Sequence, residues 1–457
     1  MAEAAAARRR PRVFYGWWIV LCSWVGDFFS LGISFYSFSL FIKPMSEELG
    51  WSRGALSFAL TLRSLLNIAL GPVVGRILDR WGPRFLMAGG ALAAGTALLL
   101  LSQVHGILSF YLIFGLLWSL GFGTMSGLVT TTVVSKWFAR RRGRAVAIAA
   151  TGISIGGITL TQLTAFLLAH YHWRTAWIVL GLLLMVVIVP LALLIMRRQP
   201  EDMGLRPDGD QSAAERQASP SRAVSGPGSS ARRGRWRWRL PTRPKQEERD
   251  WTLREAVRTP TAWLLVVASN LSGLSISTLT LHQVPLLQDR GLSVATAATV
   301  VTFFAVGSLT AKIVWGLAAE LVPLRYLATL NFLGAAAAMG LLFNVHSATA
   351  AFAYGAIAGV TMGAMPVVQN LLWPEYFGRA ALGTIRGAFA PIGALSSGFG
   401  PYLGGALFDV TGSYSIALII MIGATSTAAV LMFLARPPRV PKPVATASPA
   451  TAPTPRA

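Results

Sequence analysis

About twelve apolar stretches recur along this chain of 457 residues, and each is long enough to cross a lipid bilayer as a helix of about 20 residues. Only 13% of the residues are charged, whereas a soluble protein carries about 25%. The chain therefore lacks the charge to cover a water-facing surface. We expect an all-α membrane protein, with spans near 15–41, 54–75, 84–104, 108–134, 143–169, 174–196, 261–287, 292–317, 325–344, 347–373, 380–407 and 413–435.

The net charge of +22 would suggest a nucleic-acid partner in a soluble protein. Here the arginines gather in the loops of one side, so membrane topology explains them better. By the positive-inside rule these loops face the cytoplasm. We therefore expect a multi-pass protein of the cell membrane, with both termini in the cytoplasm and no nucleic-acid partner.

Composition divides the chain into five segments. We expect a cytoplasmic tail (1–14), a six-helix bundle (15–196), a largely disordered cytoplasmic linker (197–260), a second six-helix bundle (261–435) and a disordered cytoplasmic tail (436–457). Within the linker, residues 231–245 mix arginines with Trp236 and Trp238, which is typical of a segment attracted to anionic lipid headgroups. Residues 251–258 predict a short amphipathic helix lying on the membrane.

The stretch GRILDRWGPRFLM (75–87) lies between two apolar runs. Gly75 and Gly82 supply the backbone freedom that a short turn needs. Asp79, Arg80 and Arg84 can hold two helix ends together through charge-assisted hydrogen bonds that break and re-form.

A second copy of this pattern follows in the other half of the chain. Gly316, Glu320, Pro323 and Arg325 lie at one constant distance after Gly75, Asp79, Gly82 and Arg84. An equal offset at four positions indicates an internal repeat.

The stretch 75–87 resembles the loop between helices 2 and 3 of the major facilitator superfamily of transporters, and 316–325 resembles the degraded copy between helices 8 and 9. The resemblance implies two six-helix bundles related by a parallel internal repeat. It also implies transport by alternating access, with gating by the set Gly75, Asp79, Arg80, Gly82, Arg84, Gly316, Glu320 and Arg325.

Finer resemblance points to one branch of that superfamily. The segments YGWWIV (15–20), FSLFIKPMSEELGWSRG (38–54), KWFARRRGRAVAIAATG (136–152) and GPYLGGALFDVTGSY (400–414) are similar to the monocarboxylate transporters and the oxalate/formate antiporters. The resemblance implies a small organic anion, and a monocarboxylate in particular, as cargo.

The chain departs from this branch at several positions. Lys312, in AKIVWG (311–316), stands where the branch usually has an arginine. Ser308 replaces the aspartate of proton-linked members, and Tyr36 replaces the lysine of animal members. Residues 390–397 lack the cation of the oxalate/formate antiporters. These losses favour a monoanion over a dianion.

Asp27 and Arg63 lie near the middle of the first two spans, which run in opposite directions. A charge at mid-bilayer costs about 2.5–3.5 kcal/mol or more, so it needs a partner or a wet cavity. We expect an ion pair between the two. It serves either as a structural lock, or as a site in which Asp27 takes the proton that Ser308 cannot carry.

Lys312 is the residue that we expect to bind substrate, with Tyr36 as a hydrogen-bond donor and Arg63 as a second cation. The alternative for Lys312 is snorkelling to the headgroups, because it lies toward the cytoplasmic end of its span. For Arg386, interfacial anchoring is the expected role.

Several classes of function are set aside. No phosphate-binding loop is present, so ATP is not the energy source. No nucleophile–base pair or cluster of carboxylates indicates an enzyme, and we expect neither cofactor nor metal. We therefore expect a monomeric secondary transporter, which is coupled to protons if Asp27 takes a proton rather than serving as a structural lock. The rivals are a drug or metabolite efflux antiporter of the same fold and a transport-inactive membrane sensor.

Overall fold

The computed structural model describes residues 14–139, 141–209, 251–378 and 381–438. Over these ranges the regular elements are all helical. The N-terminal half comprises α1 (Gly16–Leu31), η1 (Gly32–Tyr36), η2 (Ser37–Leu40), α2 (Ile42–Leu49), α3 (Arg53–Trp81), α4 (Pro83–Leu101), α5 (Ile107–Phe110), η3 (Tyr111–Leu117), α6 (Trp118–Met125), α7 (Leu128–Trp137), α8 (Arg142–His170) and α9 (Trp173–Ile195).

Two short 3₁₀ turns, η4 (Pro200–Met203) and η5 (Pro207–Gly209), follow this half. The C-terminal half comprises α11 (Leu253–Val257), α12 (Pro260–Asp289), α13 (Val294–Leu321), α14 (Leu324–Leu341), η6 (Leu342–Asn344), α15 (Ala348–Met362), α16 (Met365–Phe377), α17 (Leu382–Thr411) and α18 (Ser415–Leu434).

Eleven helical segments in the described part are long and apolar enough to cross a membrane, which confirms the expectation of an all-α membrane protein. The expected eleventh span is α17, a helix of 30 residues. Its many glycine, serine and proline residues lower its mean hydropathy, so it is not among the eleven. It nevertheless lies in the bundle, packed against α3 and α12.

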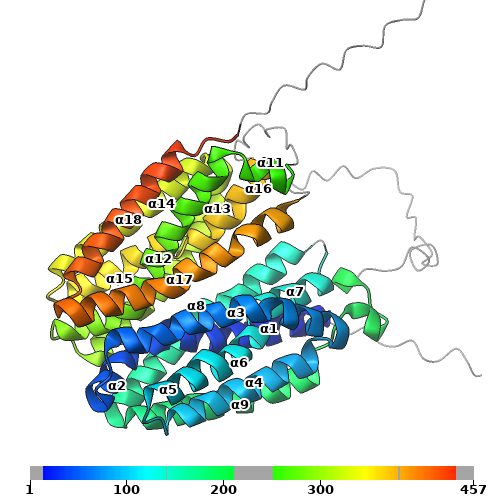
Figure 1. Cartoon of the computed structure of the whole chain (residues 1–457). Coiled ribbons are helices and arrows are strands. Elements are labelled where there is room, and N and C mark those ends of the chain that lie inside the picture. Colours follow the sequence, from blue (N-terminus) through cyan, green and yellow to red (C-terminus); the bar gives the residue numbers. More distant parts are fainter. Residues whose placement is uncertain (1–13, 140, 210–250, 379–380, 439–457) are drawn as a thin grey trace, which may run out of the picture.

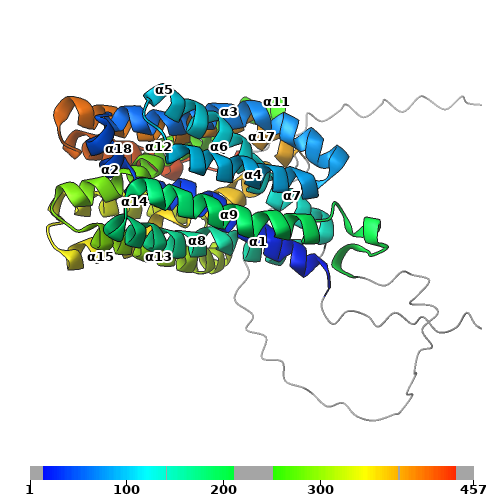
Figure 2. The same cartoon turned by 90° about the horizontal axis from the view of Figure 1, so that it is seen from below.

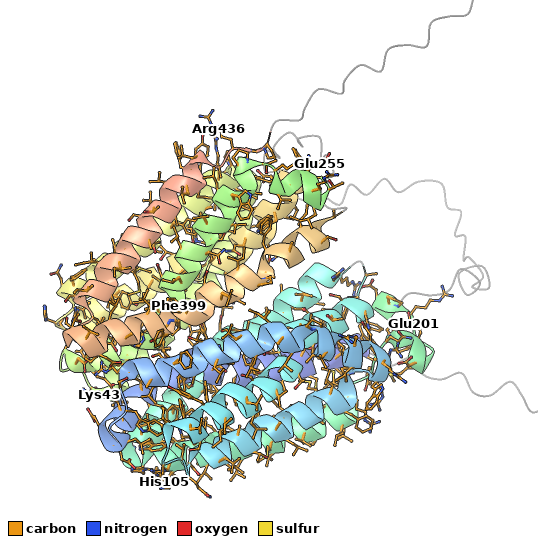
Figure 3. All side chains as sticks on the ribbon, viewed as in Figure 1. Lys43, His105, Glu201, Glu255, Phe399 and Arg436 are labelled. Atoms are coloured by element: carbon orange, nitrogen blue, oxygen red, sulfur yellow. The ribbon has the colours of Figure 1, made fainter. Side chains whose placement is uncertain are left out.

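The two halves form two bundles that meet at one end and separate toward the other (Figure 1 and, turned by 90°, Figure 2). The contacts between them are made mainly by α3 with α17 and by α8 with α13. We call the end near α2 the joined end. The opposite end, where α11 and the end of α18 lie, is the linker end. Figure 3 shows Lys43 and His105 at the joined end, and Glu201, Glu255 and Arg436 at the linker end.

The turn between α3 and α4 follows from its glycine and proline. Gly82 has a φ of +81°, which ends α3, and Pro83 begins α4 because a proline at the first helical position lacks only a donor that would be unpaired anyway. The predicted turn at Gly82 is confirmed. The turn role for Gly75 is wrong, because α3 continues through Gly75 and Asp79 to Trp81.

The fourth span of each half is interrupted in the middle. In the N-terminal half α6 ends at Met125 and α7 begins at Leu128, with Gly127 at a φ of +53° between them. In the C-terminal half α15 ends at Met362 and α16 begins at Met365. Such a break leaves the first N–H groups of the second helix without partners inside that helix.

The expected disordered linker is only partly described, since residues 210–250, including Trp236 and Trp238, lie outside the described ranges. Its first residues form η4 and η5, and the Asp208 carboxylate accepts hydrogen bonds from the backbone N–H groups of Ala139 (2.9 Å) and Arg141 (3.1 Å). The first residues of the predicted linker (197–260) are therefore ordered turns. The short helix near 251–258 is confirmed as α11, with a capping box between Thr252 and Glu255.

Candidate functional site

Arg53 connects the two halves at the joined end. Its guanidinium donates two hydrogen bonds to the Asp289 carboxylate, at 2.5 and 2.9 Å, and a third to the Tyr414 hydroxyl at 3.0 Å. The side chain is buried, and its charge also lies 3.9 Å from the centre of the Phe408 ring. A bidentate arginine–carboxylate pair is among the stronger polar contacts in proteins. It joins α3 of one half to the end of α12 in the other.

Asp409 adds a second contact at the same end. Its carboxylate accepts hydrogen bonds from the backbone N–H groups of Arg53 (2.9 Å) and Gly54 (2.8 Å), at the start of α3. The N-terminus of a helix carries unpaired donors and a partial positive charge, so it favours a carboxylate.

His282 completes this group with a defined tautomer. Its Nε2 lies 2.8 Å from the Pro401 carbonyl oxygen, and its Nδ1 lies 3.0 Å from the Tyr414 hydroxyl. A carbonyl only accepts, so Nε2 carries a hydrogen, and in the neutral ring Nδ1 accepts from the Tyr414 hydroxyl. We call Arg53, His282, Asp289, Asp409 and Tyr414 the joined-end cluster.

A second contact between the halves lies deeper in the protein, at Lys312. The Lys312 Nζ of α13 donates to the Ser154 Oγ of α8 at 3.2 Å. Lys312 also interacts electrostatically with Asp27 of α1. The amine is therefore directed at the opposite half, and the expected alternative of snorkelling to the headgroups does not describe its position here.

Asp27 is buried, with 4% of its surface exposed, and caps the broken fourth span. Its Oδ1 accepts from the Gly127 backbone N–H and from the Thr130 hydroxyl, both at 3.2 Å. These donors belong to the start of α7, where a carboxylate is favoured. The predicted ion pair between Asp27 and Arg63 is wrong, because the partners of Asp27 are Gly127, Thr130 and Lys312.

Arg63 lies apart from this carboxylate, on α3. Its guanidinium stands 4.8 Å from the centre of the Phe122 ring. Its Nε and Nη1 atoms are buried, and the described residues offer them no hydrogen-bond partner. A buried arginine donor without an acceptor is costly, so the site has capacity for an anion.

Tyr36 lies between the halves, beside the position one turn before Lys312. Its hydroxyl lies beside Ser308, and its ring packs 6.3 Å from that of Phe304. Only 3% of Tyr36 is exposed. In this conformation the hydroxyl is engaged between α13 and η1, so Tyr36 requires a rearrangement before it donates to a substrate.

The expected gating residues lie at the linker end. Asp79 forms an ion pair with Lys136 of α7 at 2.8 Å instead of the expected contact with Arg80 and Arg84. Arg325 lies 4.4 Å from the ring of its neighbour Tyr326. Gly316 lies inside α13, and the side chain of Glu320 is outside the described structure. The gating role of these residues stays a prediction.

Sequence reasoning therefore found Lys312 and Asp27 as separate candidates and did not find their proximity. It missed the joined-end cluster, although Arg53, Asp289 and Asp409 each stand at a helix end expected on the same side of the membrane. Their shared side of the membrane could be read from the sequence. Their pairing could not, because it joins residues separated by more than half of the chain.

The small residues at the start of the fifth span have a structural reason. A Cβ at Gly152 or Gly156 would collide with the backbone oxygens of Trp24 or Phe28, so α8 approaches α1 closely only because these positions lack side chains. This close approach places Ser154 and Asp27 within reach of the same lysine.

Comparison with known proteins gives one family. The family model described as Major Facilitator Superfamily matches residues 27–282 and 263–456. The oxalate:formate antiporter of Oxalobacter formigenes is 26% identical over 90% of this chain and 88% of its own length. Monocarboxylate transporter 13 of Rattus norvegicus is 24% identical over 89% of this chain and 85% of its own. Two further curated relatives match over less than half of their own length.

The fold comparison agrees with the family model. The crystal structure of a D-xylose-proton symporter superposes with a TM-score of 0.67 at 14% identity, covering 92% of this chain and 98% of that chain. At this identity the likeness concerns the fold alone. The chain is thus a multi-pass membrane transporter rather than an enzyme, works by alternating access, and belongs to the Major Facilitator Superfamily.

Proposed function

We propose that this chain carries a small organic anion, in particular a monocarboxylate, together with a proton, and that Lys312 and Asp27 form the coupling site. The observation that carries the proposal is the hydrogen bond of Lys312 to Ser154 across the two halves, together with the electrostatic attraction between Lys312 and Asp27. The oxalate:formate antiporter and the monocarboxylate transporter among its relatives support an anionic cargo.

The coupling follows from competition for one ammonium group. With Asp27 ionised, its carboxylate attracts Lys312, and an incoming anion has to compete with it. Protonation of Asp27 removes that competitor, so anion and proton bind together more favourably than either alone. Asp27 remains accommodated when neutral, since the Thr130 hydroxyl is able to reverse its hydrogen bond.

Arg63 and Tyr36 have supporting roles in this proposal. Arg63 holds a second positive charge whose buried donors lack a partner among the described residues, and we propose that it binds the anion after the carboxylate leaves Lys312. Tyr36 exchanges its contact with Ser308 for the substrate when the halves move. Asp27 therefore replaces the span-8 carboxyl group of proton-linked relatives in function while standing on the first span.

We further propose that the linker end faces the cytoplasm and the joined end faces outward, with the chain in the cell membrane. Arginines of the linker-end loops support this orientation by the positive-inside rule. The structure is then the inward-facing state, closed outside by the joined-end cluster. The domain boundaries, the monomeric state and the attraction of residues 231–245 to anionic lipids stay predictions.

The test is transport by the full chain in proteoliposomes with an imposed pH gradient. Radiolabelled acetate, lactate and formate are offered to wild type, Lys312→Gln and a matched control, Arg254→Gln, whose side chain is exposed on α11. We expect gradient-driven uptake in wild type and control and its loss in Lys312→Gln. Carboxylate uptake that survives unchanged in Lys312→Gln would refute the proposal, and export of apolar cations instead would favour the efflux rival.

A further inference from the structure

A cavity of about 420 Å³ lies in the C-terminal half, between α12, α16 and α17. Its lining includes Ser269, Asn270, Gln369, Trp373, Arg386 and Ser397. Arg386 stands in the first two turns of α17, so the cavity extends toward the linker end. It is separate from Lys312, which lies on α13 and contacts the other half.

The floor of the cavity is built from residues without bulk. Gly387, Ala390 and Gly393 of α17 line it, and a Cβ placed on either glycine meets no atom within 4 Å. Glycine inside a helix is less favourable than alanine, and here no close neighbour demands it. The glycines therefore keep free space along this face of the helix.

One wall of the cavity is aromatic. Trp373 of α16 and Phe389 of α17 both line it, and their rings stack with centroids 5.6 Å apart and planes 28° apart. The two rings pack against each other and are themselves largely buried, with 7% of Trp373 and 8% of Phe389 exposed, so they give this side of the cavity an apolar lining.

Arg386 carries the only charge among the residues that line this cavity. It is exposed, and none of the ion pairs of the described residues involves it. A guanidinium with free donors binds a carboxylate through two parallel hydrogen bonds. The other polar residues that line the cavity, Gln369, Asn270, Ser269 and Ser397, are uncharged.

We propose that this cavity binds an aromatic carboxylate. The transported anion is of this class, and it occupies the cavity when it is on the linker side. The carboxylate pairs with Arg386, and the ring lies over the glycine floor against Trp373 and Phe389. The volume falls in the range of about 300–1,000 Å³ of pockets that hold drug-sized ligands, so an acid of two or three carbons leaves most of it empty. The inference rests on the proposed function, because it narrows the class of anion.

The experiment is direct binding to the purified full chain by isothermal titration calorimetry, with indole-3-acetate, its neutral analogue 3-methylindole, and acetate as probes. We expect saturable binding of indole-3-acetate and at least ~10-fold weaker binding of both other probes. Arg386→Gln should weaken indole-3-acetate binding by ~10-fold or more. Arg144→Gln, which removes an exposed arginine near the start of α8 in the N-terminal half, should leave it unchanged.

Two further variants separate the site from a failure to fold. Gly393→Leu fills the floor without altering charge and should abolish binding, while Arg386→Lys keeps the charge and should retain part of it. Equal binding by wild type and Arg386→Gln, or acetate binding as tightly as indole-3-acetate, would overturn the inference. The inference would also be overturned if indole-3-acetate binding were lost in phosphatidylglycerol nanodiscs but kept in phosphatidylcholine nanodiscs. That result would show that Arg386 binds anionic lipid headgroups.

The outcomes distinguish this inference from the proposed function. Lys312-dependent acetate transport without an effect of Arg386→Gln on indole-3-acetate binding refutes the inference alone. Arg386-dependent binding of indole-3-acetate without transport of any carboxylate refutes the proposed function and leaves the binding site standing.

Discussion

Two of the polar contacts between the halves, at Arg53 and at Lys312, differ in strength and in surroundings. At the joined end, Arg53 makes three side-chain hydrogen bonds to the other half and its backbone N–H makes a fourth. In the middle, Lys312 makes one hydrogen bond, of 3.2 Å, to a neutral serine. Asp27 attracts the same amine electrostatically, but the hydrogen bonds that its carboxylate accepts come from the start of α7.

This difference indicates that the two contacts have different roles in transport. Contacts that close one side of a transporter hold a conformation, and several charge-assisted bonds do so until the whole set breaks. A contact that exchanges one anion for another has to be weak enough to release its partner. The joined end has the first character and the Lys312 site has the second, so substitutions at the two places should have different readouts.

The largest effect is expected from reversing the charge at the joined end. Arg53→Glu places a carboxylate beside Asp289 and Asp409, where three acids repel one another and the bonds of Arg53 are lost. Removing one partner of a buried ion pair costs about 3–5 kcal/mol, so the inter-half equilibrium should shift by more than ~100-fold toward opening of this end. The measurement is maleimide labelling of Thr61→Cys, which lies against Gly398 across the interface.

The native background suits this measurement, because Cys22 is the only cysteine and is fully buried. Faster labelling of Thr61→Cys in the Arg53→Glu background is the expected result. Asp289→Arg combined with Arg53→Glu should slow the labelling again by restoring an opposite-charge pair. Equal labelling rates with and without Arg53→Glu would show that the cluster does not hold this end closed.

A second prediction concerns coupling at the weaker contact. Asp27→Asn keeps a similar shape and removes the charge that competes for Lys312. We expect the variant to exchange labelled anion across the membrane but to lose the accumulation that a pH gradient drives. If one proton is coupled to each anion, the steady-state concentration ratio of the anion should fall by about tenfold or more. Parallel measurements of exchange and of pH-jump uptake test it, and undiminished accumulation would remove Asp27 from the coupling site.

A smaller effect is expected at Ser154. Ser154→Ala removes the one hydrogen bond that Lys312 makes to the opposite half, worth about 1 kcal/mol. The freed amine should bind the anion up to about fivefold more tightly. Equilibrium binding of the transported carboxylate measures this change, and weaker binding in the variant would show that Ser154 contributes to the anion site.

The smallest effect is expected at Glu48, which lies at the joined end but links only parts of the N-terminal half. Burial acts to raise the pKa of Glu48, but hydrogen bonds from Trp173 and Arg174 and the nearby His172 outweigh it and lower the pKa below its usual value. A carboxyl group with a lowered folded pKa stabilises above its unfolded pKa, and this stabilisation is lost as the pH falls through the folded pKa.

Melting temperatures from pH 7 down to about pH 3 should therefore fall slightly less steeply in Glu48→Gln than in wild type, because the ordinary pKa of a glutamate is about 4.3. The joined-end cluster should not respond to this substitution. A change in Thr61→Cys labelling caused by Glu48→Gln would mean that the corner around Glu48 and the inter-half contact are one unit.

Much of the fold was accessible from the sequence because spanning helices obey a local rule. Backbone polar groups in lipid have to be satisfied inside the helix, so length and hydropathy alone mark a span. The turn at Gly82 and Pro83 was equally local. The extent of α3 past Gly75 was not, because its last turns carry Arg76, Asp79 and Arg80, which lie outside the apolar run but continue the helix.

The candidate site was accessible only in part. Rare charges within apolar runs identified Asp27, Arg63 and Lys312 as residues that need partners. The choice of partner depended on the break at Gly127, which turned the donors of α7 toward Asp27, and on the close approach of α8 to α1. The opposite directions of two neighbouring spans made Arg63 a plausible partner, but depth alone does not decide which faces of the helices meet.

By itself the sequence determined that this chain crosses a membrane many times, that its halves repeat, and that a few charges remain in the apolar spans, because each of these properties depends on composition or on neighbouring residues. Tertiary structure alone decided that Lys312 faces Ser154 and Asp27, that Arg53 closes the joined end, and that Arg386 borders a cavity. The rotation of each helix about its axis is set by packing against helices far away in the chain, and that packing selects which polar groups meet.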